Sequence, residues 1–159
     1  LKDSETMGAN LSKKDITQIK NLASSILNLY GLKESHTTYV EELMQELCPN
    51  TNAITGPLIG AKLIAIASGF ERLMEFPAST IQLLGAEKAL FRHMKTGSRA
   101  PKHGIILQHQ LVANVSKENR GKAARALADK IAIASKVDYF KGEFIGADLL
   151  KKLENRFLD

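Results

Sequence analysis

The chain has 159 residues, of which 44% are hydrophobic, and a formal net charge of +5, a composition sufficient for one modest globular domain. Its single cysteine, Cys48, excludes an internal disulfide and a zinc site built from several cysteines. The chain begins at Leu1, without a signal-peptide pattern or an apolar run of membrane-spanning length, so we expect a soluble piece of a longer protein with no membrane partner.

The first predicted element is a helical hairpin over residues 1–48. Ser12 and Asp15 have the spacing of a capping box at a helix start. Apolar residues then recur every three or four positions, as in a coiled-coil seam, and Gly31 is expected to end this helix. The seam residues are Ile16, Ile19, Ala23, Ile26 and Tyr30. A second helix is expected over residues 35–48. The hairpin is either the end of a longer coiled coil or packs on the main domain, and the residues favour neither.

A compact helical domain is predicted over residues 49–159. Its central core helix is expected at residues 57–76, which are apolar nearly all round. A long helix should follow Ser116, with a stripe of small and branched apolar residues facing inward, and a last helix should span about residues 146–158. Residues 105–107 hint at a strand. The predicted fold class is therefore all-α, a hairpin followed by a compact helical domain.

The most distinctive stretch is Ser79–Gln110, which holds three of the four histidines, five basic residues and one acid. Gly85 lets the chain turn into a short amphipathic helix over residues 86–95. Its inward side chains are expected to be Ala89, Leu90 and Met94. Lys88 and Arg92 lie four positions apart beside the helix start, where free N–H groups and the helix dipole favour an anion.

Positive charge is concentrated in one half of the chain. Residues 87–136 contain eleven Lys or Arg against three Asp or Glu, a net charge of +8, so the remainder carries −3. This asymmetry is typical of a protein that binds a polyanion, although a merely solvated basic surface is the simpler alternative. Residues 95–104 lack a large apolar side chain and predict a mobile basic loop. The long helix carries a row of cations, Arg120, Lys122, Arg125, Lys130 and Lys136.

The histidine-rich centre does not predict an enzyme. His93, His103 and His109 are ten and six positions apart, with no cysteine or acid pair nearby, so we expect neither a metal nor a cofactor. Glu87 is the lone local acid, which disfavours an RNA-processing enzyme, the rival hypothesis. A purely structural coiled-coil adaptor is a third possibility. From the residues alone, His109 is expected to be packed or hydrogen-bonded.

Three motifs resemble the Nop domain: GAEKALFRHMKTG at residues 85–97, PKHGIILQH at 101–109 and RGKAARALADKIAIASKVDYF at 120–140. The similarity runs from about Met7 to the C-terminus. The family includes the archaeal protein of box C/D ribonucleoproteins, which guide RNA 2′-O-methylation, two nucleolar proteins and a pre-mRNA splicing factor. The resemblance implies a non-catalytic module that binds kink-turn RNA together with a small ribosomal-protein-like kink-turn-binding protein. A module of the splicing-factor type is the alternative within the family.

The resemblance also implies site residues. It assigns RNA binding to Lys88, Arg92, Lys95, Arg99, Lys102, His103, Gln108, His109, Arg120, Lys122 and Arg125. It assigns the partner protein to Gly85, Ala86 and Glu87. In the splicing factor the position of His109 lies against an RNA base. Gln110 stands where the family commonly has proline, which leaves the backbone after His109 less fixed.

The same resemblance implies further partners and a cellular location. In the family an amino-terminal domain holds fibrillarin, the RNA 2′-O-methyltransferase, and this sequence does not include such a domain. We therefore expect the chain to bind RNA and the kink-turn protein without recruiting fibrillarin. The complete coiled coil would allow a homodimer. The expected location is the archaeal cytoplasm or, in a eukaryote, the nucleolus.

Overall fold

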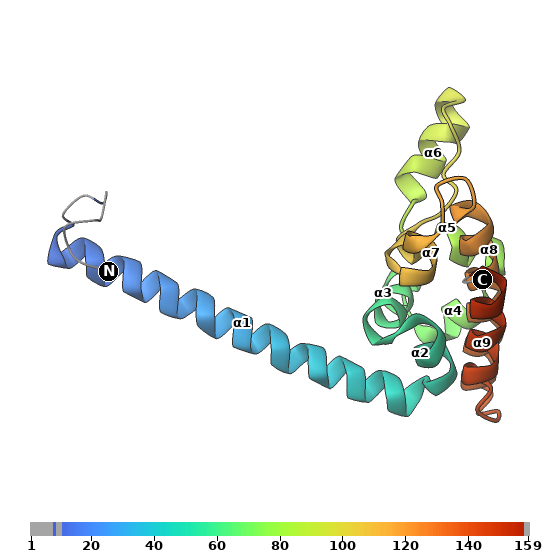
Figure 1. The fold of residues 1–159 in the computed structure, drawn as a ribbon, viewed down its shortest axis with the longest axis horizontal. Helices are drawn as coiled ribbons and strands as arrows, with labels where there is room; N and C mark the ends of the chain where they lie inside the picture. The colour runs from blue at the N-terminus through green and yellow to red at the C-terminus, as the bar shows by residue number, and fades with distance from the viewer. Residues whose placement is uncertain (1–7, 9–10, 158–159) are drawn as a thin grey trace. The chain divides into compact units, whose positions relative to one another are not determined.

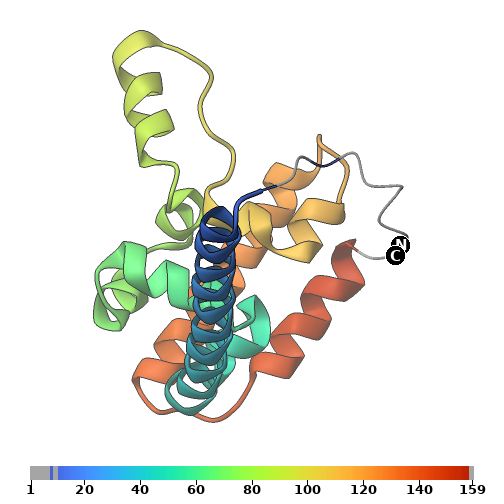
Figure 2. The same ribbon diagram turned by 90° about the vertical axis from the view of Figure 1, so that its left-hand side faces the viewer.

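The computed structural model describes residues 8 and 11–157 of the chain (Figures 1 and 2). This described part is helical and contains no strand, so the predicted all-α class is confirmed. The chain divides into two compact units, and the boundary between them in the sequence lies between Thr38 and Tyr39. The predicted division into domains at residues 1–48 and 49–159 stays a prediction, and the first residues of that hairpin lie outside the described part.

The predicted hairpin is wrong, because one continuous helix, α1 (Lys13–Leu47), takes its place. Gly31 lies inside this helix instead of ending it, and a Cβ added there would meet nothing within 4 Å. No proline occurs in α1, and a single glycine costs a helix only about 1 kcal/mol relative to alanine. That penalty does not stop a helix whose neighbouring residues are good helix formers.

The predicted start of α1 is confirmed. The Oγ of Ser12 accepts a hydrogen bond from the backbone N–H of Asp15 at 3.3 Å, and Oδ2 of Asp15 accepts one from the N–H of Ser12 at 3.2 Å. This reciprocal pair satisfies two N–H groups that a helix start leaves without partners.

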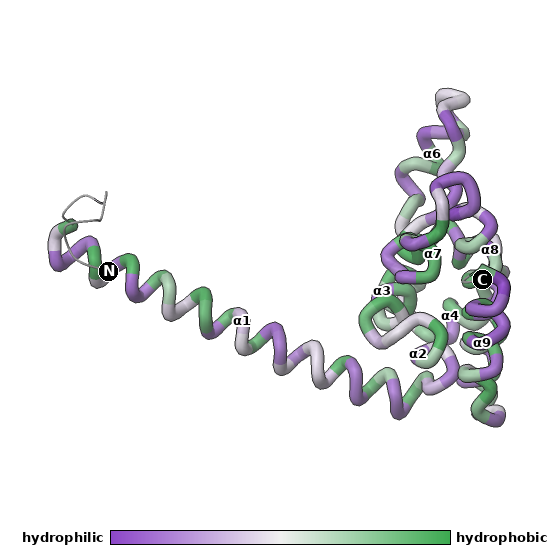
Figure 3. Tube along the Cα trace, in the orientation of Figure 1, coloured by the Kyte–Doolittle hydropathy of each residue, from purple (hydrophilic) through white to green (hydrophobic). Residues whose placement is uncertain are grey.

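Apolar residues of the predicted seam are exposed along α1. Ile19 is 54% exposed and Tyr30 is 61% exposed, and hydrophobic and hydrophilic residues alternate along the helix (Figure 3). A stripe of this kind is typical of a helix that pairs with another helix.

The second unit is built around α8, whose inward side is completely buried. It contains the end of α1, from Tyr39 onward. Its other elements are α2 (Pro49–Thr55), α3 (Pro57–Ala67), α4 (Phe70–Glu75), α5 (Ala78–Leu83), α6 (Glu87–Thr96), the 3-10 helix η2 (Ile105–Gln108), α7 (Gln110–Asn114), α8 (Arg120–Tyr139) and α9 (Gly146–Phe157). Helices α2, α4, α5 and α9 pack on α8. The buried residues of α8 include the predicted stripe Ala124, Leu127, Ile131 and Ala134.

Two predicted elements of the second unit also differ from the structure. The expected core helix at residues 57–76 is interrupted, because Ser68 and Gly69 adopt φ values of 65° and 139° that no right-handed helix can continue. The chain therefore forms α3 and α4, and the central helix is α8. The strand suggested at residues 105–107 is the 3-10 helix η2. The predicted last helix is confirmed as α9.

A buried carboxylate joins α8 to the start of α2. Oδ1 of Asp138 accepts hydrogen bonds from the backbone N–H of Asn50 at 3.0 Å and from its Nδ2 at 2.8 Å, and Oδ2 accepts one from the N–H of Thr51 at 2.8 Å. The Oδ1 of Asn50 in turn accepts from the N–H groups of Ile145 and Gly146. This network holds the beginnings of α2 and α9 against α8.

Candidate nucleic-acid interface

The candidate interface begins with a projecting segment, residues 85–104, which we call the basic arm. Gly85, with φ of 83°, turns the chain out of α5, and its N–H donates a hydrogen bond to Oε1 of Glu87 at 2.6 Å. Gly97 closes α6 in the left-handed conformation, and its N–H donates to the carbonyl of His93 at 2.8 Å. Within its unit, α6 stands away from the other helices, and residues 97–104 run back beside it (Figure 2).

No residue of α6 is buried, which corrects part of the sequence interpretation. Ala89 and Leu90 are half-buried, but Met94, expected to face inward, is 72% exposed, and Phe91 is 66% exposed. The amphipathic pattern is present, yet the arm projects, and no other described helix of the second unit covers its apolar side. The arm therefore presents cationic and apolar side chains to solvent together.

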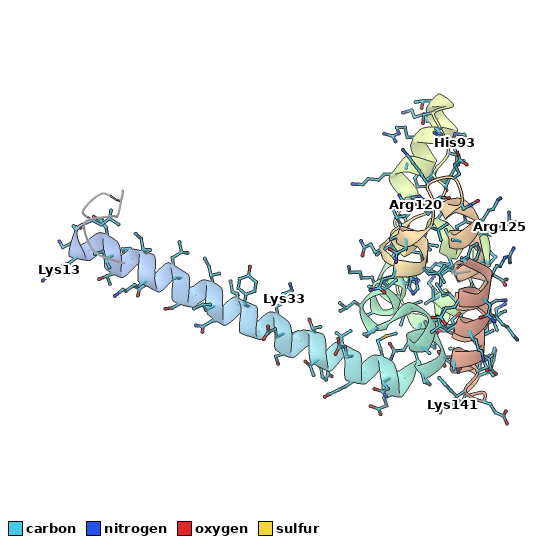
Figure 4. The ribbon with its side chains drawn as sticks, viewed as in Figure 1. Lys13, Lys33, His93, Arg120, Arg125 and Lys141 are labelled. Atoms are coloured by element: carbon cyan, nitrogen blue, oxygen red, sulfur yellow. The ribbon has the colours of Figure 1, made fainter. Side chains whose placement is uncertain are left out.

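The returning loop is anchored at both ends, although the sequence predicted no anchors. Near its end, Nε2 of Gln82 donates to the carbonyl of Lys102 at 2.7 Å, and the N–H of Gly104 donates to the carbonyl of Gln82 at 2.8 Å. At its start, Nδ1 of His93, labelled in Figure 4, forms a hydrogen bond with the carbonyl of Ser98. Each of these bonds has a backbone carbonyl as its acceptor, which composition does not reveal.

Most of the predicted cations of the arm and of α8 are exposed to solvent. The exposed ones are Lys88, Arg92, Lys95, Arg99, Lys102, Lys122 and Arg125. His103 is half-buried in the loop. The residues expected to meet a partner protein form the turn into α6, where Gly85 and Glu87 are exposed and Ala86 is half-buried.

Two cations of the predicted row on α8 are engaged within the protein. Arg120 donates from Nε to the carbonyl of Val115 at 3.2 Å and from a terminal nitrogen to that of Ala113 at 3.1 Å, so it caps the end of α7 (Figure 4). Nζ of Lys130 lies 3.1 Å from Oδ2 of Asp129. These roles leave Lys122 and Arg125 as the cations at this end of α8 that are available to a ligand.

His109 has a structural role that agrees with the interpretation from the residues alone. It is the N-cap of α7, where its Nδ1 accepts a hydrogen bond from the N–H of Leu111 at 3.2 Å. Burial lowers the pKa of His109 below its usual value of 6.5, opposed in part by a hydrogen bond with the backbone of Ile54. The lowered pKa favours the neutral ring, which an Nδ1 acceptor requires.

His109 also lies in the wall of a hollow of about 660 Å³ between α2, α3 and α9. Gln108 is in the same wall and is exposed, and its Oε1 accepts a hydrogen bond from Nζ of Lys62 at 3.1 Å. Sequence reasoning missed Lys62, because it belongs to α3 and is distant from Gln108 along the chain.

The lowered pKa predicts acid sensitivity at this position. Below pH 6.5 the unfolded chain protonates His109 more readily than the folded chain, so stability falls with falling pH in this window. His109→Asn keeps a capping acceptor but cannot titrate, and should lose less stability than the parent between about pH 7 and pH 5. Urea unfolding at both pH values checks this, with His36→Asn on exposed α1 as the control. Equal acid sensitivity of His109→Asn and parent would contradict the prediction.

The spacing of potential metal ligands and the burial of the single cysteine bear on metal binding and catalysis by the described residues. Among them no group of three His, Cys, Asp or Glu could hold a metal ion. Burial, with a smaller contribution from Asp138, raises the pKa of the Cys48 thiol to about 11, so it is a poor nucleophile. None of the helices that the structure describes is both long and apolar enough to span a membrane.

The sequence is similar to a known domain family along nearly its whole length. The sequence profile of the Nop family, described as "snoRNA binding domain, fibrillarin", matches residues 1–158. An uncharacterised NOP5 family protein of Methanocaldococcus jannaschii is 46% identical over 95% of this chain and 36% of its own length. Nucleolar protein 58 of Candida albicans is 42% identical over 95% of this chain and 29% of its own length. This chain therefore spans about a third of the length of these relatives.

A solved structure is also similar. The crystal structure of a fibrillarin/Nop5p complex contains a chain with a TM-score of 0.74 and 34% identity to this one. The match covers 93% of this chain and 55% of that chain.

Proposed function

This chain belongs to the Nop family of snoRNA-binding domains, and from that membership we propose that it is a non-catalytic RNA-binding module of a box C/D ribonucleoprotein. Its ligand is a composite surface, a kink-turn RNA with a small kink-turn-binding protein already bound. The particle would guide RNA 2′-O-methylation, in the archaeal cytoplasm or in the nucleolus of a eukaryote. In this proposal the chain positions the RNA and its partner protein and supplies positive charge, and it catalyses no reaction.

The observation that supports this proposal best is the basic arm. It combines exposed cations with exposed Phe91 and Met94 on a helix that has no covering helix of its own. Cations bind phosphates without sequence preference. Exposing large apolar side chains to water is unfavourable, so a complex in which a partner covers them is stabilised. An arm with both properties suits a surface made of RNA and protein better than bare RNA.

We assign the two halves of this recognition to different residues. The cations of α6 and of the loop meet the RNA backbone, together with Lys122 and Arg125 of α8. The turn of Gly85, Ala86 and Glu87 meets the partner protein. The exposed seam of α1 supports a coiled-coil contact, including a homodimer of the longer protein, and contact with fibrillarin belongs to parts of the longer relatives beyond this chain.

The RNA half is tested by the salt dependence of binding. Lys88→Gln with Arg92→Gln removes two charges, so the log–log slope of affinity against salt should decrease in magnitude by about 1.8. Raising the salt from about 50 to about 200 mM weakens binding to a kink-turn RNA, measured by fluorescence anisotropy. The factor of weakening should be about twelve times smaller for the variant than for the parent. The matched control replaces the exposed Lys151 and Lys152 of α9 by glutamine.

Each variant should keep the helical content and unfolding midpoint of the parent, since all four side chains are exposed. If the α6 variant has the same slope as the parent, the basic arm does not contact RNA phosphates and the proposal fails. If the α9 control changes the slope equally, general basicity explains the binding.

A further inference from the structure

The second unit has a cationic hollow on the side formed by α5, α8 and α9. Its volume is about 580 Å³, and its charged wall residues are Lys122, Arg125, Asp129 and Arg156. Lys122 and Arg125 are three positions apart on α8 and so share a face, while Arg156 comes from the end of α9, which packs against α8. Three cations from two helices thus converge on one depression.

The single acid in this wall reduces the positive charge only in part. Oδ2 of Asp129 lies 3.1 Å from Nζ of Lys130, a cation outside the hollow, so it is already balanced. The lining also includes small side chains, Ala78 of α5 and Ala126 of α8, which leave room for a ligand beside the cations. The exposed Ser79 also lines the hollow, and its hydroxyl adds a hydrogen-bond donor.

Arg156 is the unexpected member of this group. It is not among the site residues that the sequence predicted. In the structure the guanidinium carbon of Arg156 lies 5.5 Å from the centre of the Phe157 ring, a cation–π distance that restricts the arginine side chain. A restricted guanidinium loses less entropy when it binds a phosphate in its two-pronged geometry.

We propose that this hollow holds the sugar–phosphate backbone of RNA and that Arg156 contacts a phosphate there together with Lys122 and Arg125. The inference rests on the proposed RNA-binding function and adds a second contact region to the basic arm. The hollow, at about 580 Å³, is larger than a single phosphate group, and its cations come from two different helices, α8 and α9. Both properties suit a continuous backbone better than an isolated small anion.

The test replaces Arg156 by glutamine in the full chain and uses a kink-turn RNA with both stems extended. The variant should bind with a salt slope smaller in magnitude by about 0.9, so its affinity falls about 3.5-fold less than the parent's between about 50 and 200 mM salt. Arg156→Lys keeps the charge and should keep the parent slope. Lys152→Gln, an exposed cation one turn earlier on α9, is the matched control and should also keep it.

The possible failures can be told apart. If Arg156→Gln keeps the parent slope while the α6 double variant lowers it, the hollow does not hold RNA and the proposed function stands. If neither variant changes the slope, both proposals fail. If Arg156→Gln loses only binding of inorganic phosphate or a mononucleotide, the hollow is a small-anion site and the inference is overturned. Arg156 is exposed, so the glutamine variant should keep the helical content and unfolding midpoint of the parent.

Discussion

Asp138→Ala should lower the free energy of unfolding by about 3–5 kcal/mol. Asp138 is 9% exposed, and its carboxylate accepts three hydrogen bonds from Asn50 and Thr51 at the start of α2. Alanine leaves these donors without a partner in the interior, where each unsatisfied group costs about 1–3 kcal/mol. Asn50 also holds the start of α9, so the loss should spread to both helices that it joins.

Urea unfolding followed by circular dichroism measures this effect. Asp129→Ala is the matched control, because the Asp129 side chain is on the same helix but 55% exposed, and its change should stay within about 0.5 kcal/mol. Asp138→Asn retains one acceptor oxygen and should fall between the two. A loss for Asp138→Ala no greater than that of Asp129→Ala would show that the network does not hold α2 on α8.

Gly104→Ala should lower the free energy of unfolding by about 2–4 kcal/mol and release the end of the basic arm. A Cβ at Gly104 would lie 1.9 Å from the carbonyl oxygen of Leu84, a backbone atom that cannot move aside alone. Relieving the clash breaks the hydrogen bonds that Gly104 and Ile105 make to Gln82 and Leu84. The arm would then lose the anchor that fixes Lys102 and His103.

The control for this substitution is Gly121→Ala, in the first turn of α8. Its Cβ would meet only the Lys102 side chain at an ordinary distance of 3.6 Å, so alanine should be neutral or raise stability by up to about 1 kcal/mol. Thermal unfolding separates the two variants, and amide hydrogen exchange reports the arm. Parent-like stability and protection of residues 97–104 in Gly104→Ala would contradict the predicted role of this close approach.

The sequence predicted those elements whose signals are local. The capping pair of Ser12 and Asp15, the inward stripe of α8 and the glycine-bounded helix α6 all follow from spacing within a few residues. The sequence-based prediction was wrong where one residue determines whether a helix continues or ends. Gly31 continues α1, whereas Gly69 with Ser68 ends α3, and the difference depends on the φ angles that tertiary packing imposes.

The sequence predicted which charged residues the candidate site contains, but not all of the contacts that they make. The exposure of Lys88 and Arg92 follows from their spacing on one helical face. The engagement of Arg120 with the end of α7 depends on a fold that brings α7 beside the start of α8. For the same reason Arg156 and Lys62 could not be found, because each meets its neighbours only through packing between helices.

The central claim is recognition of a composite surface, and one titration tests it most directly. The chain is titrated into kink-turn RNA alone and into the same RNA saturated with its kink-turn-binding protein, at one fixed salt concentration. We expect the preformed complex to bind about tenfold tighter or more, a coupling within the usual range between sites. Glu87→Gln keeps an acceptor for Gly85 but loses its charge, and should weaken binding to the preformed complex only. Equal affinity of the parent chain for bare RNA and for the complex would contradict the account.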